Sequence, residues 1–362
     1  MSVSCRFPMS KYTPKQREDM MYAGEKADRA PVAQINGIVS SQWNGYEWKT
    51  PREDPNLAAK LISTFNREAG CDVFITLNME TNAPFMDYGM KLKFVDNNYS
   101  NVMSCYYQEP EDIEKLPNVD MSSRKTAPNA WKYLIDFCAE AANYEKNNYS
   151  EEDRHYTYAF NWGIMTCAGH LRGCEAFMMD TLLEPELAHK AIANSAELVN
   201  GVLDACLECG NDHIWIADPT SSGTMISADI YDEFVRKPQT ELVNKYHARG
   251  SKIVYHVCGE SEPVIEPIGK TGIDMFSFDY LTSIPAIAKA ADKKFVLAGN
   301  FDPMNIIWSG TPEYVIDRGK EIFEKEIGDA RYCLCTGCET PRDTPIQNLQ
   351  AMLKVSEMYA YQ

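Results

Sequence analysis

The chain has 362 residues, of which 44% are hydrophobic and 24% charged, the composition of an ordinary globular protein. Its 52 acidic residues outnumber its 35 basic residues, which gives a formal net charge of −17. Such an acidic surface repels phosphate backbones and anionic lipid heads, which argues against nucleic-acid and membrane partners. The sequence shows neither a membrane-spanning run nor, in residues 1–10, the apolar core of a secretory signal. The 12 cysteines are therefore expected as free thiols or metal ligands in a reducing cytoplasm.

Short β-rich runs alternate with helical patterns along the whole chain. Several of these runs are almost continuously apolar or β-branched, as is typical of parallel strands that are buried on both faces. The predicted strands cover residues 30–35, 72–77, 156–162, 213–218, 252–257, 274–278, 294–299 and 331–335.

Helices with clear start and stop signals lie between the predicted strands. They cover residues 54–70, 184–210, 227–250 and 311–328, and each ends at a glycine. Eight strands, most of them followed by a helix, predict one (β/α)8 barrel domain over residues 1–362, with a doubly wound open sheet as the alternative. Residues 90–95 and 103–108 flank Asp96-Asn97-Asn98, which predicts a hairpin inserted after the second strand.

Polar and sulfur-bearing residues follow the later strands at the same point of each repeat. The functional groups of a (β/α)8 barrel lie at the carboxyl ends of its strands, so we expect these side chains to gather at one mouth. They are Asp218, His256, Cys258, Asp279, Asn300, Asp302, Cys335, Cys338 and Glu339.

His256-Val257-Cys258 is the strongest indication of a metal site. In an extended segment, residues i and i+2 point to the same face, so the imidazole and the thiol can reach one ion. A buried thiol beside a hydrogen-bonded histidine is the alternative. A second thiolate would complete a Cys2His set, which suits Zn²⁺ with one position open for catalysis.

Three cysteines compete to be the third ligand. Cys333 and Cys335 lie within the last predicted strand and share a face, so at least one of them is expected in the core. Cys338 follows Thr336-Gly337, beyond the strand, where the chain can turn into the mouth. Cys338 is therefore preferred, with Cys335 as the reserve.

Carboxylates near the strand ends are candidate catalytic groups. Asp218 is preferred, because its strand precedes the one that carries His256, although it is equally suited to cap the helix that follows it. Asp279 is predicted as a second catalytic group and Glu80 as a supporting carboxylate. Candidate residues for organising or lining the mouth are Asn300, which we assign to cofactor binding, Asp302, Trp43, Asn161, Trp162 and Tyr280.

Several stretches resemble the uroporphyrinogen decarboxylase superfamily, most closely its branch of zinc-dependent corrinoid methyltransferases. They are Ile216-Ala-Asp-Pro-Thr-Ser-Ser-Gly, Tyr255-His-Val-Cys-Gly, Leu297-Ala-Gly-Asn-Phe-Asp-Pro and Thr336-Gly-Cys-Glu-Thr-Pro. That branch includes the coenzyme M methyltransferases of methanogens and methyltransferase components of bacterial demethylase systems. The resemblance implies a (β/α)8 barrel and a zinc ion held by His256, Cys258 and Cys338.

The same resemblance implies transfer of a methyl group between a small substrate and the cobalt of a corrinoid such as methylcobalamin. The substrate would be a methyl ether or another methylated donor, or a thiol acceptor. Because the chain has no Asp-x-His-x-x-Gly motif for cobalt, a separate corrinoid protein is the expected partner.

Two other functions compete with this interpretation. The first is a uroporphyrinogen-type decarboxylase, but residues 34–45 offer no arginine or lysine to a polycarboxylate substrate. The second is a non-catalytic zinc-containing barrel that binds a corrinoid, which would need a fourth protein ligand on the metal.

Overall fold

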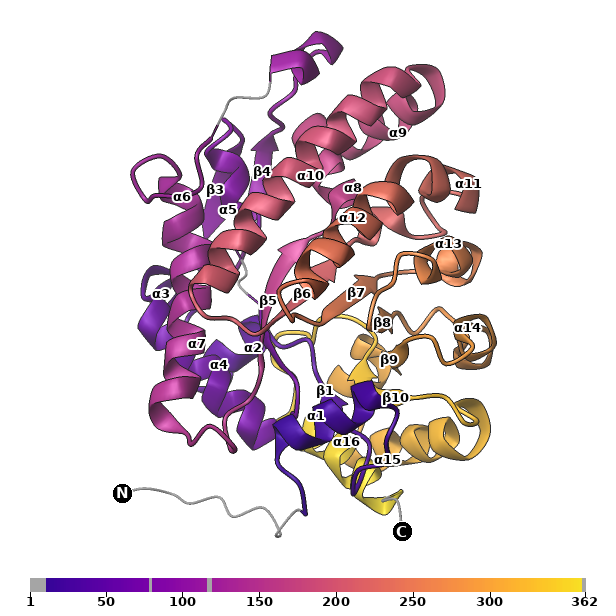
Figure 1. Ribbon diagram of the computed structural model, residues 1–362. Helices are drawn as coiled ribbons and strands as arrows, with labels where there is room; N and C mark the ends of the chain where they lie inside the picture. Colours follow the sequence, from indigo (N-terminus) through magenta and orange to yellow (C-terminus); the bar gives the residue numbers. More distant parts are fainter. Residues whose placement is uncertain (1–10, 78–79, 116–118, 360–362) are drawn as a thin grey trace.

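The computed structural model describes residues 11–77, 80–115 and 119–359. Its main sheet has eight parallel strands in the order β1-β10-β9-β8-β7-β6-β5-β2, and helices surround it (Figure 1). The predicted (β/α)8 barrel is confirmed, and every predicted strand overlaps an observed one. The strands are β1 (Val32–Ala33), β2 (Phe74–Thr76), β5 (Thr157–Trp162), β6 (His213–Ala217), β7 (Ile253–Val257), β8 (Met275–Phe278), β9 (Val296–Phe301) and β10 (Tyr332–Thr336).

The barrel closes between β1 and the residues that lead into β2. The backbone N–H groups of Asp72 and Val73 donate to the carbonyl of Val32 at 2.7 and 3.3 Å. The carboxylate of Asp72 accepts a hydrogen bond from the N–H of Val32. It also forms ion pairs with Nη1 of Arg17 at 2.5 Å and with Nη1 of Arg29 at 2.6 Å. Arg17 belongs to α1 (Pro14–Ala23), and α16 (Ile346–Met358) packs against β1 and α4, so segments near both ends of the described chain support this seam (Figure 1).

Helices cover the outside of the barrel, and none in the described residues is long and apolar enough to cross a bilayer. The four predicted helices correspond to α4, to α10, to α11 with η4 and α12, and to α15 with η7. The α-helices are α1 (Pro14–Ala23), α2 (Ile38–Trp43), α3 (Lys49–Glu53), α4 (Pro55–Ala69), α5 (Ala83–Met86), α6 (Pro128–Ala130), α7 (Asp136–Asn148), α8 (Ile164–Arg172), α9 (Cys174–Leu183), α10 (Pro185–Glu208), α11 (Ala228–Ile230), α12 (Arg236–His247), α13 (Ile265–Gly269), α14 (Ile284–Ala291), α15 (Pro312–Glu321) and α16 (Ile346–Met358). The 3₁₀ and π segments are η1 (Pro110–Lys115), η2 (Trp131–Ile135), η3 (Pro219–Ser221), η4 (Tyr231–Val235), η5 (Glu262–Val264), η6 (Pro303–Trp308) and η7 (Ile322–Glu326).

The hairpin after β2 is confirmed, but its second arm begins at residue 98, earlier than predicted. It consists of β3 (Lys91–Val95) and β4 (Asn98–Ser104), which pair antiparallel. The prediction placed the second arm at residues 103–108, which is wrong. Asp96 and Asn97 alone form the turn, and the strand resumes at once, because these residue types favour a two-residue hairpin loop.

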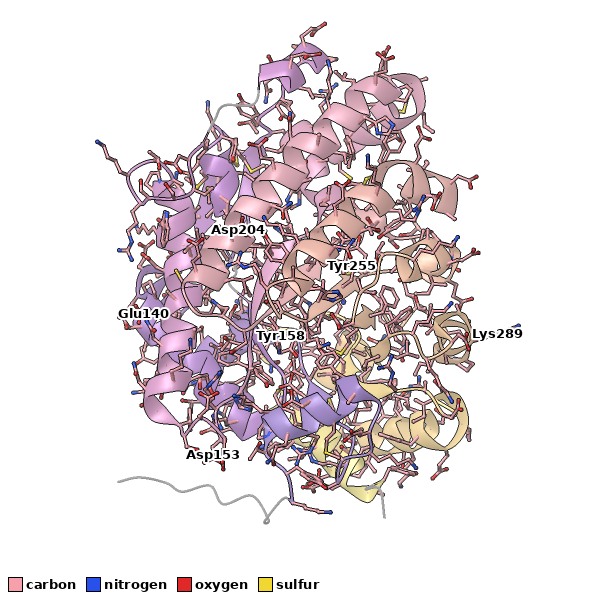
Figure 2. All side chains as sticks on the ribbon, in the orientation of Figure 1. Glu140, Asp153, Tyr158, Asp204, Tyr255 and Lys289 are labelled. Carbon is pink, nitrogen blue, oxygen red and sulfur yellow. The ribbon has the colours of Figure 1, made fainter. Side chains whose placement is uncertain are left out.

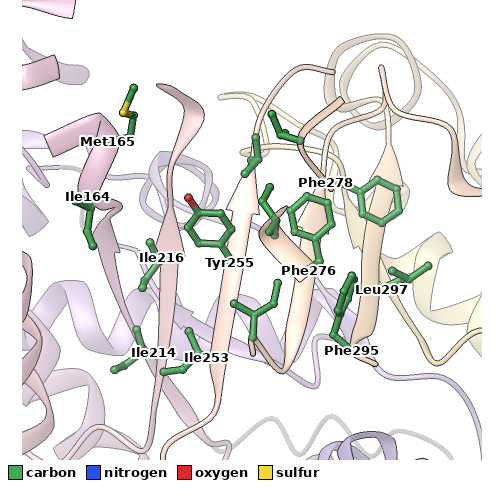
Figure 3. Packing of buried hydrophobic residues seen from close by; sticks show 14 of the residues in the cluster. Ile164, Met165, Ile214, Ile216, Ile253, Tyr255, Phe276, Phe278, Phe295 and Leu297 are labelled. Atoms are coloured by element: carbon green, nitrogen blue, oxygen red, sulfur yellow. The ribbon is translucent and has the colours of Figure 1, made fainter. Parts of the chain in front are cut away.

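Side chains of the central strands alternate between the helices outside and the barrel interior. The outward set packs under the helices in one apolar layer (Figure 3). The alternation points His256 inward, since both of its neighbours on β7 belong to this outer layer. The outward residues of β6 to β9 are Ile214, Ile216, Ile253, Tyr255, Val257, Phe276, Phe278, Leu297 and Phe301, and the inward apolar ones include Val254, Met275, Val296 and Ala298.

A buried carboxylate, Glu145 on α7, ties α4 to the segment that enters β5. Its oxygens accept hydrogen bonds from Ser63 Oγ at 2.5 Å, from Arg67 Nη2 at 2.6 Å and from the backbone N–H of His155 at 2.8 Å. Arg67 also donates to the carbonyl of Asp153, which lies at the lower edge of Figure 2. Burial alone would raise the pKa of Glu145, but hydrogen bonding to His155 and the charges of His155 and Arg67 lower it to about 2.

Replacing Glu145 with glutamine is expected to destabilise the protein by about 3 kcal/mol at pH 7, because the lowered pKa stabilises the fold. That stability is fully present above the unfolded pKa of about 4.5 and is lost as pH falls toward 2, so the two proteins should converge in acid. Denaturant unfolding at pH 7 and pH 3 measures the difference.

Glu151 provides the matched control. Hydrogen bonds from Arg154 and Lys15 also lower its pKa to about 2, but its side chain is 72% exposed. Solvent screening should therefore limit the effect of Glu151→Gln to less than about 1 kcal/mol. Equal losses for the two variants would contradict the role of burial.

Candidate metal centre

Three soft ligands meet at the carboxyl end of the barrel, from the end of β7 and the loop after β10. His256 Nε2 lies 3.1 Å from Cys258 Sγ, which lies 3.3 Å from Cys338 Sγ. One ligand atom from each side chain lies within 4.8 Å of the others. Within the described residues, this is the one group of three or more His, Cys, Asp or Glu side chains that could hold a metal ion.

Two glycines let the ligand-bearing loops approach each other. Gly259 follows Cys258 with φ 77°, a left-handed conformation that L side chains rarely adopt. Gly337 precedes Cys338, and a Cβ there would lie 2.8 Å from the backbone nitrogen of Tyr280 and 3.1 Å from the carbonyl of Phe301. Only a residue without a side chain brings the chain this close and turns Cys338 into the mouth.

The two thiols form an unequal pair. The hydrogen bond between them raises the pKa of Cys258 and lowers the pKa of Cys338. Both cysteines are partly exposed, whereas His256 is 3% exposed. A rigid imidazole beside two sulfurs that compete for a proton is a donor set that a soft divalent cation can satisfy.

The other cysteines of the last strand lie away from this pair. Cys333 and Cys335 are both fully buried among the inward residues of the barrel. Burial raises the pKa of Cys335 to about 12, which keeps it a thiol at neutral pH. Of the three candidates for the third ligand, the structure brings Cys338 to His256 and Cys258.

The structure places Asp218 on the other side of the barrel wall. It follows Ala217, an inward residue, so its side chain faces outward beside Tyr255. The carboxylate accepts from Thr166 N and Oγ1 at 2.7 and 2.6 Å, from Tyr255 OH at 2.7 Å and from Ser221 Oγ at 2.9 Å. It thereby caps the amino end of α8, the helix that follows β5, and not the helix after its own strand.

Asp279 and Asn300 lie at the mouth and hold its loops. Asp279 Oδ2 accepts from the N–H of Gly259 at 3.0 Å, and its Oδ1 accepts from the N–H of Leu281 at 3.3 Å. Burial raises the pKa of Asp279, and these two hydrogen bonds oppose the rise. Asn300 Nδ2 donates to the carbonyls of Asp279 and Thr282 at 3.2 and 2.8 Å. The two side chains therefore fix the loops that follow β7 and β8.

The remaining candidates are spread around the mouth. Glu80 is buried, and its carboxylate lies 3.6 Å from Arg52 Nη1. Asp302 accepts from the first N–H groups of η6. Trp162 donates to Asn82 at 3.0 Å, and Asn161 is buried beside it on β5. The side chains of Trp43 and Tyr280 are 46% and 42% exposed.

A cavity of about 580 Å³ lies between the hairpin and the loop that carries Cys338. Ile38, Tyr99 and Met304 form apolar parts of its wall, and Glu339 and Arg342 contribute charged groups. Its volume is within the range of small-molecule sites.

Ser277 is a neighbour of the site that sequence reasoning missed. Its Oγ lies 2.9 Å from His256 Nδ1, the ring nitrogen that faces away from the thiols. The only signal in the sequence was a small polar residue between two outward aromatic residues; its pairing with His256 comes from the register of β7 with β8.

The uroporphyrinogen decarboxylase (URO-D) family matches residues 13–359, and the chain belongs to this family. The methylcobamide:CoM methyltransferase MtbA of Methanosarcina acetivorans is 24% identical over 357 residues, which cover 98% of this chain and 100% of that protein. A methylated-thiol–coenzyme M methyltransferase of Methanosarcina mazei is 31% identical over 193 residues, covering 52% of this chain and 49% of that protein. A solved structure of a methyltransferase from Methanosarcina mazei has the same fold, with a TM-score of 0.83, 21% identity and coverage of 96% and 99%.

Proposed function

We propose that the chain is a zinc-dependent methyltransferase that moves a methyl group between a small substrate and the cobalt of a separate corrinoid protein. The observation that carries this proposal is the convergence of His256, Cys258 and Cys338 within 4.8 Å at the barrel mouth. The full-length similarity to a methylcobamide:CoM methyltransferase supports it.

The donor set fits zinc and leaves room for a substrate. Two thiolates and a neutral imidazole compensate the charge of Zn²⁺, and no fourth His, Cys, Asp or Glu in the described residues joins the group. Bound there, zinc would supply a Lewis acid that lowers the pKa of a thiol or withdraws charge from a leaving oxygen. With three protein donors, a zinc ion would keep one position for a substrate, which argues against a purely structural site.

The surrounding residues hold the ligands in place. Asp279 accepts hydrogen bonds from the N–H groups of Gly259 and Leu281 and so connects the loop after β7 to the loop after β8. Asn300 holds the loop after β8 by donating to the carbonyls of Asp279 and Thr282. Asp218 anchors the end of β6 to α8 from outside the barrel. All three residues would therefore act as positioning residues. The reaction needs them because the reacting groups must be held in a precise arrangement.

Two further features define the reaction partners. The chain lacks its own Asp-x-His-x-x-Gly motif, so the cobalt would come from a docked corrinoid protein. A cavity of about 580 Å³, lined by Glu339, the residue that follows Cys338, would accommodate a donor larger than a small thiol. We therefore favour transfer from a larger methylated donor to cobalt.

A decarboxylase activity has less support, since residues 34–45 carry no cationic side chain for a polycarboxylate.

Ligand binding to the zinc-loaded protein tests this direction. A methyl ether or methylamine analogue is expected to change the zinc X-ray absorption spectrum, whereas a thiol such as coenzyme M should leave it unchanged. If the thiol instead adds a sulfur neighbour at about 2.3 Å and releases close to one proton, the protein delivers methyl groups to a thiol. Protein that binds no zinc would refute the proposed function itself.

A further inference from the structure

Ser277 lies directly beside His256 in the barrel interior. The two residues are partners in the register of β7 and β8, and both side chains point inward between outward neighbours. Ser277 Oγ lies 2.9 Å from His256 Nδ1, and both side chains are buried, with 0% and 3% of their surface exposed. No water is needed to bridge them, so the hydroxyl sets the hydrogen bonding of this ring nitrogen.

The hydroxyl has a second neighbour that can receive its single proton. Cys335, the buried thiol on β10, is that neighbour, because hydrogen bonding from Ser277 lowers the pKa of this thiol. A serine has one O–H donor and two acceptor lone pairs. If the proton points to the sulfur of Cys335, Ser277 Oγ can only accept from His256, and the hydrogen then resides on Nδ1.

The position of that hydrogen decides what the other ring nitrogen can do. In a neutral imidazole one nitrogen carries hydrogen and the other offers a lone pair. With hydrogen on Nδ1, the lone pair is on Nε2, which faces Cys258 at 3.1 Å. A ring with hydrogen on Nε2 would instead present a donor to the thiols and repel a cation.

We propose that Ser277 is a positioning residue that holds His256 in the Nδ1–H tautomer and so prepares Nε2 to bind metal. The effect on metal binding rests on the proposed function, but the tautomer of His256 is a property of the metal-free protein. Partners of this kind typically contribute 10- to 100-fold to metal affinity.

Nitrogen NMR of metal-free protein labelled at its six histidines tests the tautomer directly. Measured about two pH units above the ordinary histidine pKa, wild-type His256 should show hydrogen on Nδ1 alone. Ser277→Ala should give a mixture of tautomers, and Ser277→Thr, which keeps the hydroxyl, should restore the single form. Hydrogen on Nε2 in the wild type, or an unchanged spectrum in Ser277→Ala, would overturn the proposal.

Zinc affinity, measured by competition with a chelator, provides the second readout. Ser277→Ala should bind zinc roughly 10- to 100-fold more weakly. The matched control is Ser195→Ala, which removes another fully buried hydroxyl, bonded to a helix carbonyl on α10, and should leave the affinity unchanged. Equal affinities for wild type and Ser277→Ala would also overturn the proposal. A wild type that holds the Nδ1–H tautomer but binds no zinc would instead refute the proposed function and leave the positioning of His256 standing.

Discussion

Protein with Cys258 or Cys338 replaced by alanine is expected to lose its zinc, from about one ion per chain to almost none. Removing either thiolate leaves two of the three donors that converge within 4.8 Å. Because even partners of metal ligands contribute 10- to 100-fold to affinity, loss of a ligand should cost more than about 100-fold. Methyl transfer should fall with the metal. Elemental analysis measures the zinc content, and a chelator-competition assay measures the zinc affinity.

Cys335→Ala is the matched control for this prediction. It removes a cysteine only three positions before Cys338, but one whose thiol lies among the inward core residues. Its zinc content should stay at the wild-type level. Loss of zinc in this variant, together with full occupancy in Cys338→Ala, would transfer the role of third ligand to Cys335.

Methyl transfer is expected to depend completely on an added corrinoid. The chain has no cobalt-ligand motif, so the protein with substrate alone should show no turnover. Adding free cob(I)alamin or a small corrinoid protein together with the methyl donor should produce the absorbance change of methyl-cobalt formation. Because the proposed reaction activates the substrate only at the metal, zinc-depleted protein should lose that change by a factor of about 100 or more.

Two controls distinguish the need for the corrinoid partner from the need for the metal. The Cys338→Ala variant with corrinoid tests the metal, and wild type with a cobalt-free corrinoid tests the cobalt. Both should be inactive. Sustained turnover of wild type with no corrinoid present would contradict the proposed reaction.

The barrel was predictable because its strands carry a strong local signal. Residues of β6 and β7 are apolar on both faces, which only a buried parallel sheet requires. The second arm of the hairpin was placed wrongly because its outer face is exposed and its residues, beginning with Asn98-Tyr99-Ser100, carry little apolar pattern. The loop chemistry of Asp96-Asn97 was the better guide there.

The candidate ligands were predictable from their positions relative to the strands. The spacing of His256 and Cys258 places both side chains on one face, and Gly337 marks the close approach that turns Cys338 inward. The surroundings of Asp218 were less accessible to such reasoning. Its position at a strand end predicts a place at the mouth. Because side chains alternate along a strand, however, Asp218 faces outward, one residue after the inward Ala217.

The contact of Ser277 depends on pairing between strands, which the sequence does not specify residue by residue. The segment Met275-Phe276-Ser277-Phe278 indicates only that Ser277 faces away from two aromatic side chains. That it lies opposite His256 follows from the register of β7 with β8. A small polar residue between large outward ones is a signal worth examining once a neighbouring strand carries a ligand.

The placement of Cys338 has a consequence for the order in which a newly made chain becomes functional. Cys258 and Cys338 are 80 positions apart, and the second lies just after β10, the strand that pairs with both β9 and β1. A ribosome releases His256 and Cys258 well before this last strand can join the first. Until then these two residues form only part of a chelator, so tight metal capture must wait for completion of the barrel. An ion held at this position would thus report that synthesis and closure had both succeeded.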